Sequence, residues 1–322
     1  MKMYGKMIFA PGLITGKEFL GKSFDAYINK HKARILLPEF SGDLTVLGFL
    51  SCPNQLDNKM FDISNYNSNK WGIIAEMPQG KRKSVKVQIN AAGIIFDNIN
   101  PDDEELKDEL HDALNEISRT INIIGLISNR TFLPGIDFPQ TTRERIQLTY
   151  KDNDKLEYYF EPVTNLQTKE TKIKPMYYSR FKDSFIKLSK GYILNPVYDI
   201  FYHAVQNIRH KNYRMAAIDM GTCMDLFLDY IVGNYLERFI EKSAVNTMLS
   251  GLYNFKKKRI FINNTSYFNH KIPNFDFIKE RNKAVHEFKQ PPASLLHKEI
   301  YEIYDLLAKF GIPLLLKDKK SK

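Results

Sequence analysis

The pattern of apolar residues changes in kind near residue 165, and this change limits the folds that the chain can adopt. Before it, short β-branched and aromatic runs alternate with clusters of Gly, Pro, Asn and Asp, a pattern typical of strands. After it, apolar residues recur every three or four positions, which is typical of amphipathic helices. We predict an α+β protein with a strand-rich domain over 1–165, a linker over 166–180 and an all-α, up-and-down helical bundle over 181–318.

The first half holds several candidate strands and one candidate helix. The strands are expected at 32–38, 44–50, 71–77, 84–89, 92–98, 145–151 and 156–162. The helix is expected over 101–127, because Pro101 and the acidic residues after it suit a helix N-terminus. Its apolar residues recur at helical spacing, at Leu106, Leu110, Leu114 and Ile117.

The second half is expected to be helical throughout most of its length. The helices are expected at 178–190, 195–211, 212–242, 275–288 and 293–311. Asn195 is a suitable N-cap for the second of these, and Pro196 suits its first turn. The longest helix presents one apolar face, formed by Ala216, Met220, Cys223, Phe227, Tyr230 and Ile231. A looser basic segment is expected at 254–274.

All of the excess positive charge lies in the second half. Residues 1–150 hold 18 Lys and Arg and 18 Asp and Glu, whereas residues 151–322 hold 29 and 19, which accounts for the net charge of +10. A basic domain beside a neutral one favours a polyanionic partner such as nucleic acid. The alternative is a basic surface that serves solubility alone. The run KKKR at 256–259 is open to both interpretations, as a contact with an RNA backbone or as a solvated loop.

The composition excludes several classes of protein. With 43% hydrophobic and 26% charged residues, the chain has enough apolar residues for a core, and no apolar run approaches the roughly 18 residues of a transmembrane helix. Pro11 and Gly12 interrupt the N-terminal apolar stretch, unlike a signal peptide. We therefore expect a soluble, cytoplasmic protein. Two distant cysteines, Cys52 and Cys223, and scattered histidines predict no metal site and no cofactor.

The segment RNKAVHEF, at 281–288, places an arginine, an asparagine and a histidine close together near the end of the basic half. These residue types suit RNA cleavage by the adjacent ribose 2′-hydroxyl. A histidine can take or give a proton because its ordinary pKa, about 6.5, is near neutrality. A guanidinium can contact two phosphate oxygens and stabilise the charge that develops on them. The simpler alternative is an ordinary helix with polar residues on its outer face.

Helix geometry limits how these side chains can act together. Asn282 and His286 are four residues apart and share a face. Arg281 and His286 are five apart, which separates them by about 140° around the helix. They converge only if the last turn loosens before the prolines at 291 and 292, or if two copies of the helix meet.

The segment from about Tyr192 to Gly311 resembles a HEPN domain, and most closely the ApeA-like, abortive-infection branch of that superfamily. The motif Arg-Asn-x-x-x-His is present as RNKAVH, and FYHAVQNIRHKNYRMAAIDMGTCMDLFL is similar to the helical hairpin that precedes it in the family. A small residue commonly follows the family histidine, whereas Glu287 stands here. No family is identified for the N-terminal half, which by analogy would be a sensor or regulator.

The resemblance implies roles for individual residues. Arg281 and His286 would be the catalytic pair, and Asn282 would orient the phosphate or hold the helix end. Such domains usually dimerise, so that motifs from two protomers form one cleft. Asp225 stands where the family often has a glutamate and would be a partner of Arg281, although an exposed helix carboxylate is the alternative. Lys279 and Lys283 flank the motif and are candidate phosphate contacts.

Two functions of different classes follow. The first is a metal-independent endoribonuclease that cuts tRNA, rRNA or mRNA as a homodimer, in anti-phage defence or as a toxin, with a phage-derived trigger or an antitoxin as a possible further partner. The second is a catalytically inactive HEPN module that binds nucleotides, RNA or proteins. The presence of arginine, asparagine and histidine together favours the enzyme, because a module that only binds does not require all three.

Overall fold

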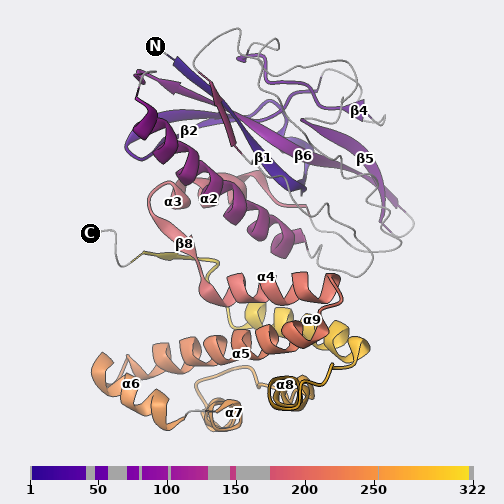
Figure 1. The fold of residues 1–322 in the computed structure, drawn as a ribbon, viewed down its shortest axis with the longest axis vertical. Coiled ribbons are helices and arrows are strands. Elements are labelled where there is room, and N and C mark those ends of the chain that lie inside the picture. Colours follow the sequence, from indigo (N-terminus) through magenta and orange to yellow (C-terminus); the bar gives the residue numbers. More distant parts are fainter. Residues whose placement is uncertain are drawn as a thin grey trace. The chain divides into compact units, whose positions relative to one another are not determined.

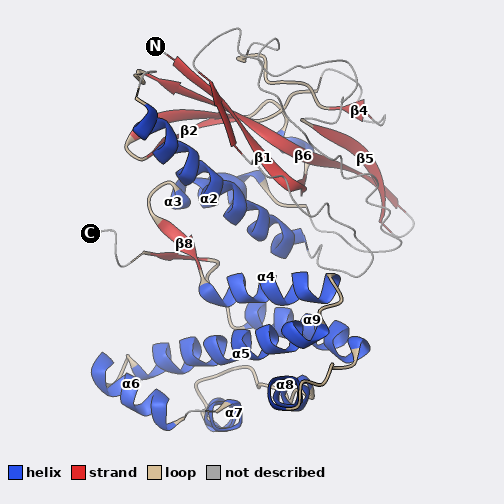
Figure 2. Ribbon diagram, viewed as in Figure 1, coloured by secondary structure: helices blue, strands red, loops and turns tan. Residues whose placement is uncertain are grey.

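A computed structural model gives the fold, and the chain divides into two compact units (Figures 1 and 2). The structure describes residues 2–40, 48–56, 71–79, 82–100, 103–129, 146–149, 175–252 and 254–318. One unit comprises Met1–Ile193 with Lys317–Lys322, and the other comprises Leu194–Leu316. The first contains an antiparallel sheet and the second is built mainly of helices, so the predicted α+β class is confirmed.

The named strands of the first unit all pair in antiparallel fashion. Its strands are β1 (Lys2–Thr15), β2 (Ser23–Ile28), β3 (His31–Leu36), β4 (Gly48–Phe49), β5 (Gly72–Gln79), β6 (Arg82–Asp97) and β7 (Ile146–Thr149). They follow the order β2-β3-β6-β1-β7, and β5 pairs with both β4 and β6. One edge of β6 pairs with β1, while its other edge pairs with β5 and then with β3. The long strand β6 therefore carries most of the sheet.

Several strands differ from the sequence-based expectation. The segments expected at 84–89 and 92–98 are one continuous strand, β6, and β1 and β2 were not expected. The apolar pattern of β1 is broken by Pro11 and Gly12, and the register of β1 against β6 shifts between Ile8 and Leu13. A strand with such an irregularity has no continuous alternation to detect. The segment expected at 156–162 lies outside the described residues.

The helix predicted by the apolar spacing is present as α2 (Glu104–Asn129), and it packs against the sheet. Its buried side chains include Leu110, Leu114, Ile117, Ile121 and Ile124. The Ser118 hydroxyl donates a hydrogen bond of 2.5 Å to the Ile8 carbonyl of β1. This contact ties α2 to β1, which lies between β6 and β7 in the sheet.

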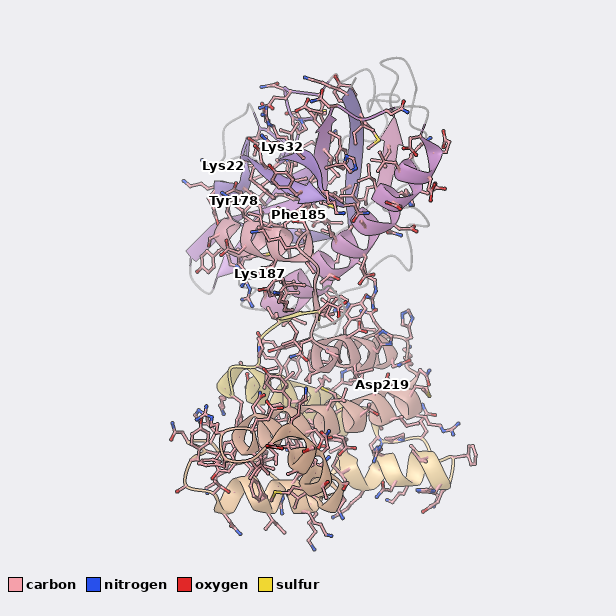
Figure 3. The ribbon with its side chains drawn as sticks, turned by 90° about the vertical axis from the view of Figure 1, so that its left-hand side faces the viewer. Lys22, Lys32, Tyr178, Phe185, Lys187 and Asp219 are labelled. Atoms are coloured by element: carbon pink, nitrogen blue, oxygen red, sulfur yellow. The ribbon has the colours of Figure 1, made fainter. Side chains whose placement is uncertain are left out.

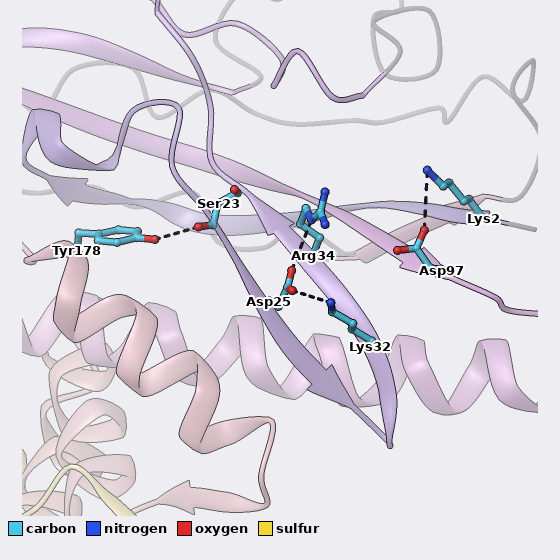
Figure 4. Close-up of polar contacts among 7 residues, drawn as sticks. All are labelled: Lys2, Ser23, Asp25, Lys32, Arg34, Asp97 and Tyr178. Carbon is cyan, nitrogen blue, oxygen red and sulfur yellow. Dashed lines mark hydrogen bonds and ion pairs between the residues drawn. The ribbon is translucent and has the colours of Figure 1, made fainter.

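Helix α3 (Tyr178–Leu188) belongs to the sheet unit, whereas the sequence pattern placed it in the bundle. It lies beside α2 on the same side of the sheet (Figure 2). The buried rings of Phe181 and Phe185 meet the rings of Phe9, Phe19 and Phe24. Figure 3 labels Tyr178 and Phe185 on this helix, and the Tyr178 hydroxyl donates to the Ser23 carbonyl at 3.3 Å (Figure 4).

The boundary of the helical unit therefore lies at Leu194, later than expected. A helical period predicts a helix but not which core receives its apolar face, and the three phenylalanines that receive α3 lie far earlier in the chain. Most of the predicted linker, 166–174, lies outside the described residues. A short pair of strands, β8 (Tyr192–Leu194) and β9 (Leu315–Lys317), forms a separate two-stranded sheet.

The helical unit is arranged around helix α5. Its helices are α4 (Pro196–Arg209), α5 (Tyr213–Leu236), α6 (Lys242–Gly251), α7 (Phe255–Asn264), α8 (Phe277–His286) and α9 (Ala293–Lys309). Helix α5 packs against all of the others (Figure 1). The predicted apolar face is largely confirmed, since the side chains of Ala216, Met220, Cys223, Phe227 and Ile231 are buried. Among the helices that the structure describes, none has the length and apolarity that crossing a membrane requires.

Local sequence signals predicted the start of α4 but did not predict α7. The Asn195 side chain accepts a hydrogen bond of 3.1 Å from the Val197 N–H, so it caps α4 as predicted. The segment expected as a loose basic stretch at 254–274 instead contains α7. Its mean hydropathy is low because the run KKKR occupies its first half, and only Phe255, Lys258 and Ile262 are buried.

Candidate active site

The motif RNKAVH occupies the second half of α8, and α8 packs against α5. Both oxygens of the Glu299 carboxylate, which belongs to α9, accept hydrogen bonds from the first backbone N–H groups of α8. The Asp276 N–H donates at 3.0 Å and the Phe277 N–H at 2.8 Å. Burial raises the pKa of Glu299, while these two donors act to lower it. A carboxylate at this end also complements the positive end of the helix dipole.

The other end of α8 is held by Arg214 from the first turn of α5. The Arg214 Nε donates a hydrogen bond of 2.9 Å to the Ala284 carbonyl, which a continuing helix would have satisfied. Its guanidinium also lies 4.4 Å from the centre of the Phe288 ring. Phe288 has a positive φ of 54°, so the chain turns out of the helix there. Charged side chains from two other helices therefore fix both ends of the motif helix.

The last turn of α8 keeps regular α-helical hydrogen bonding. The Glu287 N–H donates to the Lys283 carbonyl at 2.8 Å, four residues back. The turn has not loosened, so Arg281 and His286 stay on different sides of one helix. Of the two routes to convergence that the sequence left open, a loosened last turn is not seen in the described structure.

The Arg281 side chain lies across α5 at a glycine. A Cβ atom on Gly221 would lie 2.3 Å from the Arg281 Cδ and 2.5 Å from its Nε, so a larger residue there would force the Arg281 side chain to move. The Arg281 Nε is buried and has no hydrogen-bond partner among the described residues. Its Nη2 lies 3.7 Å from the Asp225 Oδ2, one helical turn further along α5. The structure thus brings together Arg281 and its predicted partner.

Asp225 is only partly exposed, with 36% of its side chain accessible. Burial raises the pKa of its carboxyl, and the nearby charges of Arg281 and Lys258 partly oppose that effect. One turn further along α5, Asp229 pairs with the buried Lys258 of α7 at 2.7 Å. Two carboxylates of α5 therefore face one cation on α8 and one on α7, which holds both helices against α5.

A pocket of about 590 Å³ opens between α5, α7 and α8. Its charged lining residues are Asp225, Lys256, Arg259, Lys279 and Arg281. Three asparagines, at 254, 274 and 282, add amide groups that can both donate and accept hydrogen bonds. With four cations and one carboxylate among the described lining residues, the pocket favours an anionic ligand.

Two predicted site residues, Lys283 and His286, do not belong to the described lining of the pocket. His286 is exposed at the end of α8. Lys283 donates to Glu280 at 2.7 Å on the same helix, whereas Lys279, which lines the pocket, lies 3.8 Å from Asp276. Glu287 pairs with Lys289 at 2.6 Å, and this hydrogen bond lowers the pKa of Glu287. The structure thus gathers Arg281, Asn282, Asp225 and Lys279, but not Lys283 or His286.

Sequence reasoning did not identify Gly221 and Arg259 as parts of the site. Gly221 lies within the longest expected helix, over 212–242, and Arg259 is one of four residues in the basic run KKKR. A signal for the second was present, because Lys256 and Arg259 are three residues apart and share a helix face. It becomes informative only when the segment is known to be helical.

Replacing Gly221 by alanine tests the position of Arg281 by its effect on stability. Alanine in place of glycine in a helix ordinarily stabilises by roughly 1 kcal/mol. At Gly221 we expect a net loss of about 1 kcal/mol instead, because the new methyl overlaps Arg281. Gly233→Ala is the matched control, since its Cβ would have its nearest contact at 3.7 Å, from Leu249. Urea unfolding of both variants measures the difference, and equal gains would contradict this placement of Arg281.

Comparisons with models of protein families, with curated proteins and with solved structures found no match for this chain. Among the described residues, no group of three or more His, Cys, Asp or Glu side chains is arranged to hold a metal ion. The assignment of a function therefore rests on the motif and on the geometry around α8.

Proposed function

We propose that the protein is a metal-independent endoribonuclease of the HEPN type. The observation that carries the proposal is the position of Arg281, whose side chain crosses α5 and reaches a basic pocket beside Asn282. The helix that bears both residues is held at each end by a side chain from another helix, as a preorganised site requires.

In the proposed reaction the ribose 2′-hydroxyl attacks the adjacent phosphate. His286 takes the proton of that hydroxyl as general base, and an acid protonates the leaving 5′-oxygen. Arg281 binds two phosphate oxygens and stabilises their growing negative charge, while Asn282 orients the phosphate. Asp225 holds the guanidinium in place. The products carry a 2′,3′-cyclic phosphate and a 5′-hydroxyl.

The proposed active form is a homodimer through the helical unit. Since Arg281 and His286 point to different sides of one regular helix, each site would combine residues of two protomers. In the cell, such a nuclease would act in anti-phage defence or as a toxin. The sheet unit would then respond to a phage-derived trigger or to an antitoxin.

The test compares the wild type with His286→Ala in cells, with and without phage, and follows host growth and the integrity of tRNA and rRNA. We expect the wild type to cut RNA or block phage, and His286→Ala to lose the effect while staying folded. His203→Ala is the control, because His203 is a similarly exposed histidine on α4. Identical behaviour of all three proteins under every challenge would overturn the proposal.

One observation favours the second candidate, a module that binds RNA or nucleotides without cutting them. His286 does not belong to the described lining of the pocket that holds Arg281 and Asn282. The ends of the RNA products distinguish the two functions. The purified enzyme should yield cyclic phosphate ends in the presence of EDTA, whereas a binding module leaves RNA intact.

A further inference from the structure

We propose that the pocket between α5, α7 and α8 binds one nucleotide of the RNA strand, with its phosphate held between Arg259 of α7 and Arg281 of α8. This inference deepens the proposed function and rests on it for the identity of the strand as RNA. It assigns a substrate-binding role to Arg259, which is outside the motif.

Each of the two arginines has a guanidinium nitrogen without a hydrogen-bond acceptor among the described residues. The Nε atoms of Arg259 and Arg281 are both buried, and neither has a hydrogen-bond partner within the described part of the chain. Both residues line the same pocket, on helices that face each other across it. A phosphate between them would supply acceptors for two planar guanidinium groups, which bind phosphate oxygens in pairs.

Arg259 lies on α7, a helix that is held against α5. Its neighbour Lys258 is 5% exposed and pairs with Asp229 of α5 at 2.7 Å. The Asn254 side chain caps the same helix by accepting a hydrogen bond of 2.9 Å from the Lys257 N–H. Helix α7 is therefore anchored to α5, and Arg259 is presented from a rigid element rather than from a loop.

The dimensions and the polar groups of the pocket suit a nucleotide. A volume of about 590 Å³ lies within the usual range for small-molecule sites. The asparagine amides in its wall can pair with the edge of a base, since each offers donors and an acceptor. Asp225 is the acid among the described lining residues, and its carboxylate competes with an incoming phosphate for Arg281.

Binding is measured with the full-length His286→Ala protein, so that RNA is not consumed. The probe is a fluorescent single-stranded RNA, and a nucleoside 5′-monophosphate and its nucleoside compete with it. We expect Arg259→Ala to weaken RNA binding at least about 10-fold and Arg259→Lys to weaken it less. Asp225→Asn should tighten binding several-fold, because it removes the competing charge. The monophosphate should compete better than the nucleoside.

Lys257→Ala is the matched control, since Lys257 lies in the same basic run but does not line the described pocket. It should change affinity by about 2-fold at most. Equal losses for Arg259→Ala and Lys257→Ala would overturn the inference and leave only a basic surface. The inference and the proposed function fail separately. If the wild type does not cut RNA but Arg259 is selectively needed for binding, the pocket stands without the nuclease.

Discussion

Replacing Glu299 by alanine is expected to destabilise the helical unit by about 3 kcal/mol, because two backbone N–H groups at the start of α8 lose their acceptors. Glu299 is 3% exposed, so water cannot readily replace the carboxylate. Glutamine keeps one oxygen acceptor and nearly the same volume, and Glu299→Gln should lose about 1 kcal/mol. Urea unfolding of the full chain measures the change in free energy.

The control for this prediction lies on the same helix. Glu302 pairs with Lys298 at 3.8 Å on the surface, and Glu302→Ala should cost less than about 1 kcal/mol. Hydrogen exchange locates the effect, since the amides of α8 should lose protection in Glu299→Ala and keep it in Glu302→Ala. Equal stabilities of the two alanine variants would show that Glu299 does not hold the motif helix.

Mixing two inactive variants is expected to restore RNA cleavage. Arg281→Ala and His286→Ala should each lose about 100-fold or more in rate, because one lacks the phosphate clamp and the other the general base. In a mixed dimer, one site receives Arg281 from one protomer and His286 from its partner. Random exchange makes about half of the dimers mixed, so activity should return to roughly a quarter of the wild-type value.

A control mixture tests whether recovery of activity requires Arg281 from one protomer and His286 from the other. Arg281→Ala mixed with the double variant Arg281→Ala/His286→Ala forms no complete site and should remain inactive. If the first mixture also stays inactive although the protomers exchange, Arg281 and His286 act within one chain. The last turn of α8 would then have to open when RNA binds, against the hydrogen bond from Glu287 to Lys283.

Much of the secondary structure follows from local sequence patterns. The period of the apolar residues in α2 and α5 predicted both helices and most of their buried faces, because a helix repeats every 3.6 residues whatever it packs against. Asn195 and Pro196 marked the start of α4 for the same local reason. The strand β1, which lies between β6 and β7 in the sheet, was missed because an irregularity at Pro11 and Gly12 removes its alternation.

The sequence alone also determined three properties of the motif. It lies on a helix in the second half of the chain, it contains an arginine, an asparagine and a histidine, and the half around it is basic. Only the tertiary structure decided what surrounds it. Helix α3 joined the sheet unit because its phenylalanines met others more than 150 positions earlier.

The contacts of α8 show most clearly which features follow from local sequence and which depend on the tertiary structure. Asp276, the residue at its N-terminal end, makes no side-chain cap among the described contacts, and the cap comes from Glu299 on another helix. Gly221 leaves the space that Arg281 fills, and Arg259 faces the same pocket from α7. These contacts join residues far apart in the chain, so no local pattern encodes them. The sequence specified the chemical groups of the site, and the packing of α5, α7, α8 and α9 decided which of them meet.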